Sequence, residues 1–297
     1  MRALRETVHP PTGHSFRVIQ WSRNLRDVEV MLAPGTTEKI RGEGTRWHYH
    51  VAMELTLFTA GEGTRFVGDQ IESFKAGDLV LLGEKLPHYW HTRGTSAGIS
   101  VQWHFPEGHA LWAFPELLSA LSLFKKAGRG VQFTGSTAAH LREALGGIAQ
   151  TSEAARLARL LLLFSIMVNA PERDRRLLSH RSFELPTDSL YQESMGRVMR
   201  HLIARFREPV RLEEVLKIAG MSRPTFSRQF KKHAGHTCSE FLNRLRLQAA
   251  RRDLTESDSS VLEIAMTSGF TQVSFFNRLF RRHLGCSPSQ FRERSRA

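Results

Sequence analysis

The sequence predicts a multidomain α+β protein, with an antiparallel β-barrel or sandwich first, a helical region next and an all-α domain last. Three observations lead to this prediction. Short apolar runs separated by Gly, Asp and Pro extend to about residue 106, and apolar residues at helical spacing follow to about residue 170. One constellation of residues then occurs twice before the C-terminus, which is typical of a repeated structural unit. The length of 297 residues fits about two domains.

The first part, residues 1–106, is predicted to be a β-domain. Its clearest strand-like runs are residues 55–58, 65–67, 70–74 and 79–82. Gly68 and Asp69 suit a two-residue hairpin turn between the second and third runs, because glycine tolerates a positive φ. Runs this closely spaced favour an antiparallel sandwich or barrel.

The second part, residues 107–170, is predicted to be helical. Helical spacing relates Leu117, Leu118, Leu121 and Phe124, and a second stripe follows on residues 152–169, formed by Leu157, Leu160, Leu161 and Phe164. An internal core is the favoured interpretation of this second stripe, and a dimer seam is the other. The charged segment 171–188 contains two prolines and lacks periodicity, so we interpret residues 171–190 as an interdomain linker.

Charge and composition limit the classes of protein to be considered. The last 107 residues contain 20 Lys and Arg against 10 Asp and Glu, whereas the first 190 contain 22 against 19. This asymmetry points to nucleic acid or an anionic surface as a partner. The sequence has no apolar run long enough for a membrane span and no apolar signal region near residue 1, and it holds only two cysteines. We therefore expect a cytoplasmic protein without membrane association.

The last part, residues 191–297, repeats itself. One copy begins at Leu212 and the other at Val261. The matching pairs are Gly220 with Gly269, Phe226 with Phe276, Arg228 with Arg278, Phe230 with Phe280, Gly235 with Gly285 and Phe241 with Phe291. The offset is 49 before the turn and 50 after it, so the second copy has one extra residue in or just after the turn.

Each copy has the pattern of a helix-turn-helix. A short amphipathic helix ends at a glycine, and the next helix opens with a capping residue, Ser222 or Thr271. The outer face of this second helix is predicted to read base edges in a major groove through Arg223, Thr225, Ser227 and Arg228 in the first copy and Gln272, Val273, Ser274, Asn277 and Arg278 in the second. Phosphate contacts are expected from Lys231, Lys232, Arg281 and Arg282. The alternative, a solvated charged face on an ordinary helical bundle, is disfavoured by the repetition.

These two copies resemble the DNA-binding domain of the AraC/XylS family of bacterial regulators, over about residues 195–294. The resemblance implies two recognition helices that enter successive major-groove segments and a long connecting helix, here about residues 239–254. It also implies base-reading positions at Pro224, Ser227 and Arg228, and at Val273, Ser274 and Arg278. Pro224 and Val273 have no side-chain hydrogen-bonding group, so they could contact only thymine methyls or backbone.

A different motif lies in the first part. Gly42, His48, His50, Glu54 and Gly61 resemble the first cupin motif at every position, which makes the predicted barrel cupin-like. His48, His50 and Glu54 share parity along a predicted strand, so their side chains should point to the same face.

The second cupin motif is partial. Gly77 begins it and His88 falls at its histidine, whereas Gly83, Lys85 and Thr92 depart from the usual residues. In metal-binding cupins these positions hold one divalent ion, so the resemblance implies a possible metal site formed by His48, His50, Glu54 and His88. The other interpretation is a sensory pocket in which these groups bind a small-molecule effector or one another.

The function expected from these motifs is sequence-specific regulation of transcription. The family resemblance implies an effector-responsive activator of catabolic genes, carbohydrate genes among them, with double-stranded DNA, RNA polymerase, a small-molecule effector such as a sugar, and a second copy of the chain as partners. We do not expect an enzyme. The alternatives are a cupin metalloenzyme of isomerase or dioxygenase type fused to a DNA-binding domain, and an architectural DNA binder, which the mixed polar residues of the recognition helices disfavour.

Overall fold

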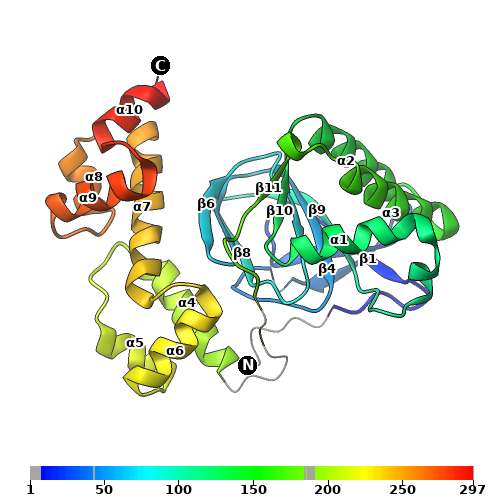
Figure 1. The fold of residues 1–297 in the computed structure, drawn as a ribbon, viewed down its shortest axis with the longest axis horizontal. Coiled ribbons are helices and arrows are strands. Elements are labelled where there is room, and N and C mark those ends of the chain that lie inside the picture. Colours follow the sequence, from blue (N-terminus) through cyan, green and yellow to red (C-terminus); the bar gives the residue numbers. More distant parts are fainter. Residues whose placement is uncertain (1–7, 43, 184, 186–190, 297) are drawn as a thin grey trace. The chain divides into compact units, whose positions relative to one another are not determined.

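The structure, a computed structural model, describes residues 8–42, 44–183, 185 and 191–296. Its described residues divide into two compact units, of which the first ends at residue 185 and the second consists of residues 191–296 together with Ile71–Ser73 (Figure 1). Within the described ranges, no helix combines the length and the hydropathy that a membrane span requires.

The first unit is built on two antiparallel sheets that form a barrel (Figure 1). The larger sheet has the spatial order β11 (Arg175–Leu177), β10 (Val131–Phe133), β7 (Leu79–Leu82), β4 (Met53–Ala60), β9 (Ala97–Trp103), β1 (Phe16–Trp21), β2 (Asp27–Ala33) and β3 (Thr36–Arg41). The smaller sheet has the order β6 (Gln70–Phe74), β5 (Gly63–Val67) and β8 (His88–Thr92). The predicted antiparallel barrel is confirmed, and Gly68 makes the turn between β5 and β6 with a φ of +58°.

Strands of the larger sheet separate two hydrophobic cores. On β4, Leu55 and Leu57 belong to the core beneath the helices, whereas Phe58 belongs to the core inside the barrel. Since successive side chains of a strand point to opposite faces, Glu54 and Thr56 lie on the same inner face as Phe58. This alternation places a buried carboxylate inside the barrel.

Three helices cover the outer face of the larger sheet (Figure 1): α1 (Leu118–Ala127), α2 (Gly135–Ile148) and α3 (Glu153–Val168). The structure buries only some of the residues in the apolar stripes predicted for this region. On α1 the buried residues are Ala120, Leu123 and Ala127, and the predicted Leu118 and Leu121 are exposed. On α3 the buried apolar residues are Leu160, Leu163, Phe164 and Met167, and the predicted Leu157 is exposed.

The segment predicted as an interdomain linker begins as part of the barrel. Residues Arg175–Leu177 form β11, which pairs with β10, a strand within the region predicted to be helical. Asp69, at the β5–β6 turn, accepts hydrogen bonds from Ser179 Oγ at 2.9 Å and from the His180 backbone N–H at 2.9 Å. Leu178 and Phe183 are buried in the barrel core. The linker interpretation is therefore wrong up to residue 183, and residues 184 and 186–190 lie outside the described residues.

The second unit is helical (Figure 1), with α4 (Gln192–Arg205), α5 (Leu212–Ala219), α6 (Arg223–Ala234), α7 (Cys238–Glu256), α8 (Val261–Thr267), α9 (Val273–Leu284) and α10 (Pro288–Arg296). Helices α5 and α6 form one helix-turn-helix, α8 and α9 form the other, and α7 connects them. The connecting helix starts with a capping box in which Thr237 and Glu240 satisfy each other's backbone N–H groups.

The turns and cores of the two helix-turn-helix units match as the repeat predicts. Gly220 caps α5 with a φ of +64°, and Gly269 follows α8 with a φ of +94°. Helix α6 begins three residues after Gly220 and α9 begins four residues after Gly269, which locates the extra residue in the second turn. Ser222 occupies the N-cap position of α6 as predicted, although its hydroxyl bonds to Thr225 Oγ1 and not to a backbone N–H, and the N-cap of α9 is Gln272 rather than Thr271.

Three phenylalanine rings at equivalent positions form a chain in both cores, and Phe270 adds a fourth ring to the second chain, 5.1 Å from Phe276. In the first unit the ring centroids lie 5.4 Å apart for Phe226 and Phe230 and 5.7 Å apart for Phe230 and Phe241. The equivalent distances in the second unit are 5.4 Å and 5.6 Å, from Phe276 through Phe280 to Phe291. Because these rings fix the inner face of each second helix, they also determine which residues that helix presents to solvent.

Candidate functional site

Helix α6 presents the predicted DNA-reading residues of the first copy on the face away from its buried phenylalanines. Arg223, Pro224, Ser227 and Arg228 are exposed, and Thr225 is half-buried. Pro224 stands in the first turn, where the missing N–H costs the helix no hydrogen bond. The basic residues Lys231 and Lys232, in the last turn of α6, are exposed as well.

Helix α9 repeats this arrangement with different chemistry. Gln272, Ser274 and Arg278 are exposed, Val273 and Asn277 are half-buried, and Arg281 and Arg282 are exposed in the last turn. The Arg278 guanidinium lies over the Phe275 ring at 5.6 Å from its centroid. The first copy has Thr225 at the position of Phe275, so the equivalent Arg228 has no such aromatic neighbour on its own helix. The two helices thus present two different surfaces, as a reader of two different base sequences requires.

Three histidines meet inside the barrel. His48, His50 and His88 are each no more than 3% exposed, and one ring nitrogen of each lies within 4.8 Å of the others. His48, His50 and Glu54 were predicted to share one strand, which is wrong in detail. Only Glu54 belongs to β4, while His48 forms an isolated bridge with His88 and His50 lies in the segment before the strand.

Backbone carbonyls orient all three imidazoles. Nδ1 of His48 bonds to Arg46 O at 2.7 Å, Nδ1 of His50 to Ala52 O at 2.8 Å, and Nδ1 of His88 to Leu86 O at 2.8 Å. A carbonyl only accepts, so each Nδ1 carries the proton and donates. Nε2 of His88 is buried without a hydrogen-bond partner, and burial holds the pKa of His88 well below its ordinary value. His88 therefore directs an unprotonated nitrogen into the cluster.

Glu54 is surrounded by hydrogen-bond donors. Its Oε2 accepts from Gln102 Nε2 at 2.7 Å and lies 2.9 Å from His50 Nε2, and its Oε1 accepts from the Thr56 hydroxyl. Arg17 donates to Gln102 Oε1 through Nε at 2.8 Å, so the NH2 group of the Gln102 side chain must face Glu54. Burial alone would raise the pKa of Glu54, but the hydrogen bond from His50 and the other donors outweigh it and hold the pKa well below its ordinary value.

The cluster forms the polar end of a cavity of about 50 Å³. His48, Glu54, His88 and Gln102 line this end, and the apolar walls include Ile19, Trp21, Val28, Phe58 and Trp90. A water molecule needs roughly 10 to 15 Å³ of such space, so the cavity has room for a few waters or a small ion with its ligands. Leu25 and Trp90 also line a wider outer hollow of about 310 Å³.

The histidine cluster fits a metal ion on three grounds. Histidine ligands in proteins usually donate Nδ1–H to a carbonyl, which leaves Nε2 for the metal, and all three histidines have this Nδ1 bond here. At His50 the Nε2 proton shared with Glu54 would have to leave when a metal ion binds. The orphaned Nε2 of His88 is a buried polar atom that a cation would satisfy. Glu54 places an anion 3.8 Å from the same nitrogen. Three nitrogens with one carboxylate suit a divalent transition ion.

Sequence reasoning missed the residues that support Glu54. Arg17, Thr56, Ser100 and Gln102 come from three strands, and each is buried. Arg17 and Gln102 are cross-strand partners of β1 and β9, 85 residues apart in the sequence. Polar residues at inward-facing positions of otherwise apolar strands were the available signal, but without the register they could not be connected to the histidines.

Comparisons with known protein families agree with both halves of this description. Residues 35–167 match the family of AraC-like ligand binding domains, and residues 215–294 match a helix-turn-helix domain family. Among solved structures, the DNA-binding domain of AdpA in complex with a target DNA is similar, at 33% identity and a TM-score of 0.34, over 35% of this chain and 93% of that one. ToxT from Vibrio cholerae is similar at 12% identity and a TM-score of 0.35, over 94% of this chain and 97% of that one.

Relatives by sequence are transcriptional regulators and not enzymes. The chain is 27% identical over 254 residues to the HTH-type transcriptional activator RhaS of Salmonella heidelberg, covering 83% of this chain and 87% of the relative. It is 42% identical over 99 residues to RhaS of Escherichia fergusonii, covering 32% of this chain and 36% of the relative. The fused metalloenzyme is therefore not favoured. The chain belongs to the AraC/XylS family of DNA-binding transcription regulators, with a cupin-like ligand-binding domain followed by two helix-turn-helix units.

Proposed function

We propose that this protein is an effector-responsive transcription activator that reads two segments of one operator with α6 and α9. The observation that carries the proposal is the repeated recognition helix, in which equivalent phenylalanine cores present two different sets of exposed residues. The relatives named transcriptional activators support activation rather than repression. RNA polymerase is then a partner, and catabolic genes, including carbohydrate genes, are the proposed targets in the cytoplasm.

The DNA-reading part of the proposal predicts a loss of specificity when either arginine is removed. Arg228→Ala or Arg278→Ala should weaken binding to the operator by about 1 to 3 kcal/mol, because each change deletes a base-edge donor. The control Lys232→Ala removes a proposed phosphate contact and should weaken binding to operator and random DNA equally. Fluorescence anisotropy with both duplexes checks this. Equal losses on operator and random DNA for the arginine variants would show that they do not read bases.

The barrel is the proposed sensor, and its innermost ligand is proposed to be a divalent metal ion held by His48, His50, His88 and Glu54. When bound, such an ion supplies a Lewis-acid centre to which a small anionic or hydroxylated effector can attach. The cavity volume supports this assignment, because about 50 Å³ does not accommodate a whole sugar. Any larger part of an effector would occupy the outer hollow beyond Leu25 and Trp90.

Metal analysis tests this sensor. Full-length protein purified without a metal-affinity column should contain about one divalent metal ion per chain by mass spectrometry, since four buried ligand groups converge there. His88→Ala should lose most of the metal, whereas the exposed His104→Ala should keep it. Protein that is metal-free and takes up neither zinc nor nickel in calorimetry would leave the four residues as a plain effector pocket.

A chain of contacts leads from the cluster to the segment that precedes the second unit. The Gly68 N–H donates to Pro87 O at 2.8 Å, next to His88, and Asp69 holds Ser179 and His180. A ligand that shifts His88 would therefore change how firmly residues 178–183 are attached to the barrel. The proposed response is a change in this attachment, worth the 1 to 3 kcal/mol or so that is typical of allosteric coupling.

A second copy of the chain is the proposed partner of the exposed apolar face of α1 and α3. Leu118 is 50% exposed, Leu121 40%, Leu157 37% and Leu162 42%. Ala154 and Ala158 are also exposed on α3 and Leu161 is half-buried, with the half-buried Arg159 as the charged residue among them. A face of this kind matches the dimer seam that the sequence left open as an interpretation of the α3 stripe, and it is the basis of the proposed homodimer.

A further inference from the structure

A short loop between α4 and α5, residues 206–208, is held by the connecting helix. Arg246, on α7, donates through Nε to Phe206 O at 2.7 Å and through Nη2 to Glu208 O at 3.0 Å. These two bonds to backbone carbonyls fix the course of the loop, which belongs to the first half of the DNA-binding unit. They do not depend on the protonation of any partner, since carbonyls stay acceptors at every pH.

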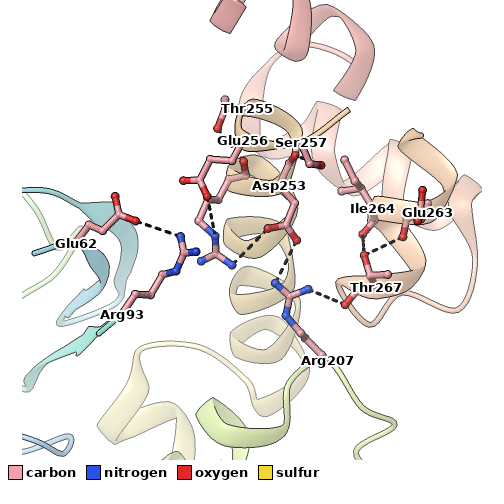
Figure 2. Close-up of polar contacts among 11 residues, drawn as sticks. Glu62, Arg93, Arg207, Asp253, Thr255, Glu256, Ser257, Glu263, Ile264 and Thr267 are labelled. Atoms are coloured by element: carbon pink, nitrogen blue, oxygen red, sulfur yellow. Dashed lines mark hydrogen bonds and ion pairs between the residues drawn. The ribbon is translucent and has the colours of Figure 1, made fainter. Parts of the chain in front are cut away.

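The same loop reaches the second half through Arg207. Its Nη1 donates to Thr267 O at 2.8 Å, and its Nη2 donates to Asp253 Oδ2 at 3.1 Å (Figure 2). Thr267 is the last residue of α8, the first helix of the second helix-turn-helix. A guanidinium at this end of a helix satisfies a carbonyl that lacks a partner within the helix.

Gly269 shows how closely the loop and the second turn approach. A Cβ atom at Gly269 would lie 2.7 Å from Phe206 O and 2.9 Å from Arg207 O. These are backbone atoms, so they could move aside only if the whole loop shifted. With its φ of +94°, Gly269 thus serves both the turn before α9 and the contact with the loop.

We infer that Arg207 is a positioning residue for DNA recognition: it fixes the second helix-turn-helix relative to the first, so that α6 and α9 fit one duplex together. The inference rests on the proposed reading of two operator segments. With α7 as the sole connection, bending of one helix would change the spacing of the recognition helices. The Arg207 contacts add a second connection, and two linked binding surfaces bind tightly together only when their geometry suits both sites at once.

The chain offers a matched control two residues away. Arg205 donates through Nε to Glu208 Oε2 at 2.8 Å and through Nη1 to Glu214 Oε1 at 2.9 Å. Both of its partners belong to the first half, and its side chain is 45% exposed against 38% for Arg207. Arg205→Ala and Arg207→Ala therefore remove the same charge and similar bonds, but only Arg207→Ala breaks the connection to α8.

The test uses the full chain and a duplex enriched from random DNA by the unaltered protein, with two further duplexes in which one or the other segment is scrambled. Arg207→Ala should weaken binding to the intact duplex about tenfold more than Arg205→Ala does, because the two surfaces no longer fit together. Both variants should bind each scrambled duplex with the same affinity. If Arg207→Ala had instead lost its fold, it would bind the scrambled duplexes more weakly than Arg205→Ala does. Equal affinities of the two variants on the intact duplex would overturn the inference.

Asp253→Ala gives a second variant in which charge works in the opposite direction. It removes the carboxylate that accepts from Arg207 and raises the net charge by one, which should strengthen binding to phosphates. The inference predicts weaker binding to the intact duplex all the same, with binding to scrambled duplexes unchanged or stronger. Binding of the intact duplex at or above the unaltered affinity would overturn the inference. Enrichment of only a single segment by the unaltered protein would overturn both the proposed function and this inference.

Discussion

His233 is a buried histidine in the last turn of α6, directly after the two lysines proposed to contact phosphates. It is 1% exposed, Nδ1 donates to Gln229 O at 2.8 Å, and Nε2 is buried without a partner. Burial, together with the neighbouring charge of Lys232, holds the pKa of His233 below its ordinary value of 6.5 despite that hydrogen bond. The native state therefore keeps this residue neutral where the unfolded chain would be protonated.

This arrangement predicts that acid destabilises the first helix-turn-helix. As the pH falls below 6.5, His233 binds a proton in the unfolded state but not in the native state. The free energy of unfolding, which is highest above that pH, therefore decreases until the pH reaches the lower pKa of the native state. Hydrogen exchange in α6 should accelerate between about pH 7.5 and pH 5.5 relative to intrinsic rates, and His233→Leu should reduce the change. Exchange with the same pH dependence in both proteins would contradict the assignment.

At single positions, the sequence was informative where a motif supplied the spacing. The four metal-ligand candidates lie together because His48, His50 and Glu54 are close in sequence and His88 pairs with His48. Their support by Arg17 and Gln102 depends on the β1–β9 register, which no local pattern determines. The contacts of Arg207 could not be predicted from the sequence either, because its partners lie 46 and 60 residues further along the chain.

At the scale of elements, the helices α1 and α3 show where periodicity is insufficient. Residues 157–164 of α3 read LARLLLLF, which is apolar on most sides of a helix, so the spacing could not determine which leucines face the core. Packing against the sheet and α1 selects Leu160, Leu163 and Phe164, and leaves Leu157 and Leu162 outside. Strands β10 and β11 were missed for a related reason: each has three residues, too few to establish a period of two.

The two sides of α3 should respond differently to substitution. Leu162→Glu should dissociate the proposed homodimer with little change in thermal stability, because a charge would enter an otherwise apolar seam. Leu160→Ala should instead lower the free energy of unfolding by about 2 to 5 kcal/mol, as expected for a cavity in a core. Sedimentation velocity and thermal unfolding of the full chain separate these effects. A monomeric unaltered protein at micromolar concentration would show that this face is not a dimer seam.

At the scale of the whole molecule, the sequence predicted two units because two of its properties change along the chain. The period of the apolar pattern changes from strand to helix, and the excess of basic residues is concentrated in residues 191–297. Both changes follow from the solvent and the partners that each unit faces, and these determine which residues occur in it. Residues 175–177 are attached to the barrel through β10, and Ser179 and His180 through Asp69, more than a hundred residues away, which explains why this segment resembled a linker.

Selection of binding sites from a random-sequence duplex pool by the full-length protein tests the central claim most directly. The two recognition helices predict an enriched sequence with two specified segments, about 10 base pairs or one helical turn apart, and a different consensus in each segment because α6 and α9 present different side chains. Enrichment of a sequence with both segments would support the account. Enrichment of no sequence, or of one short segment alone, would contradict it.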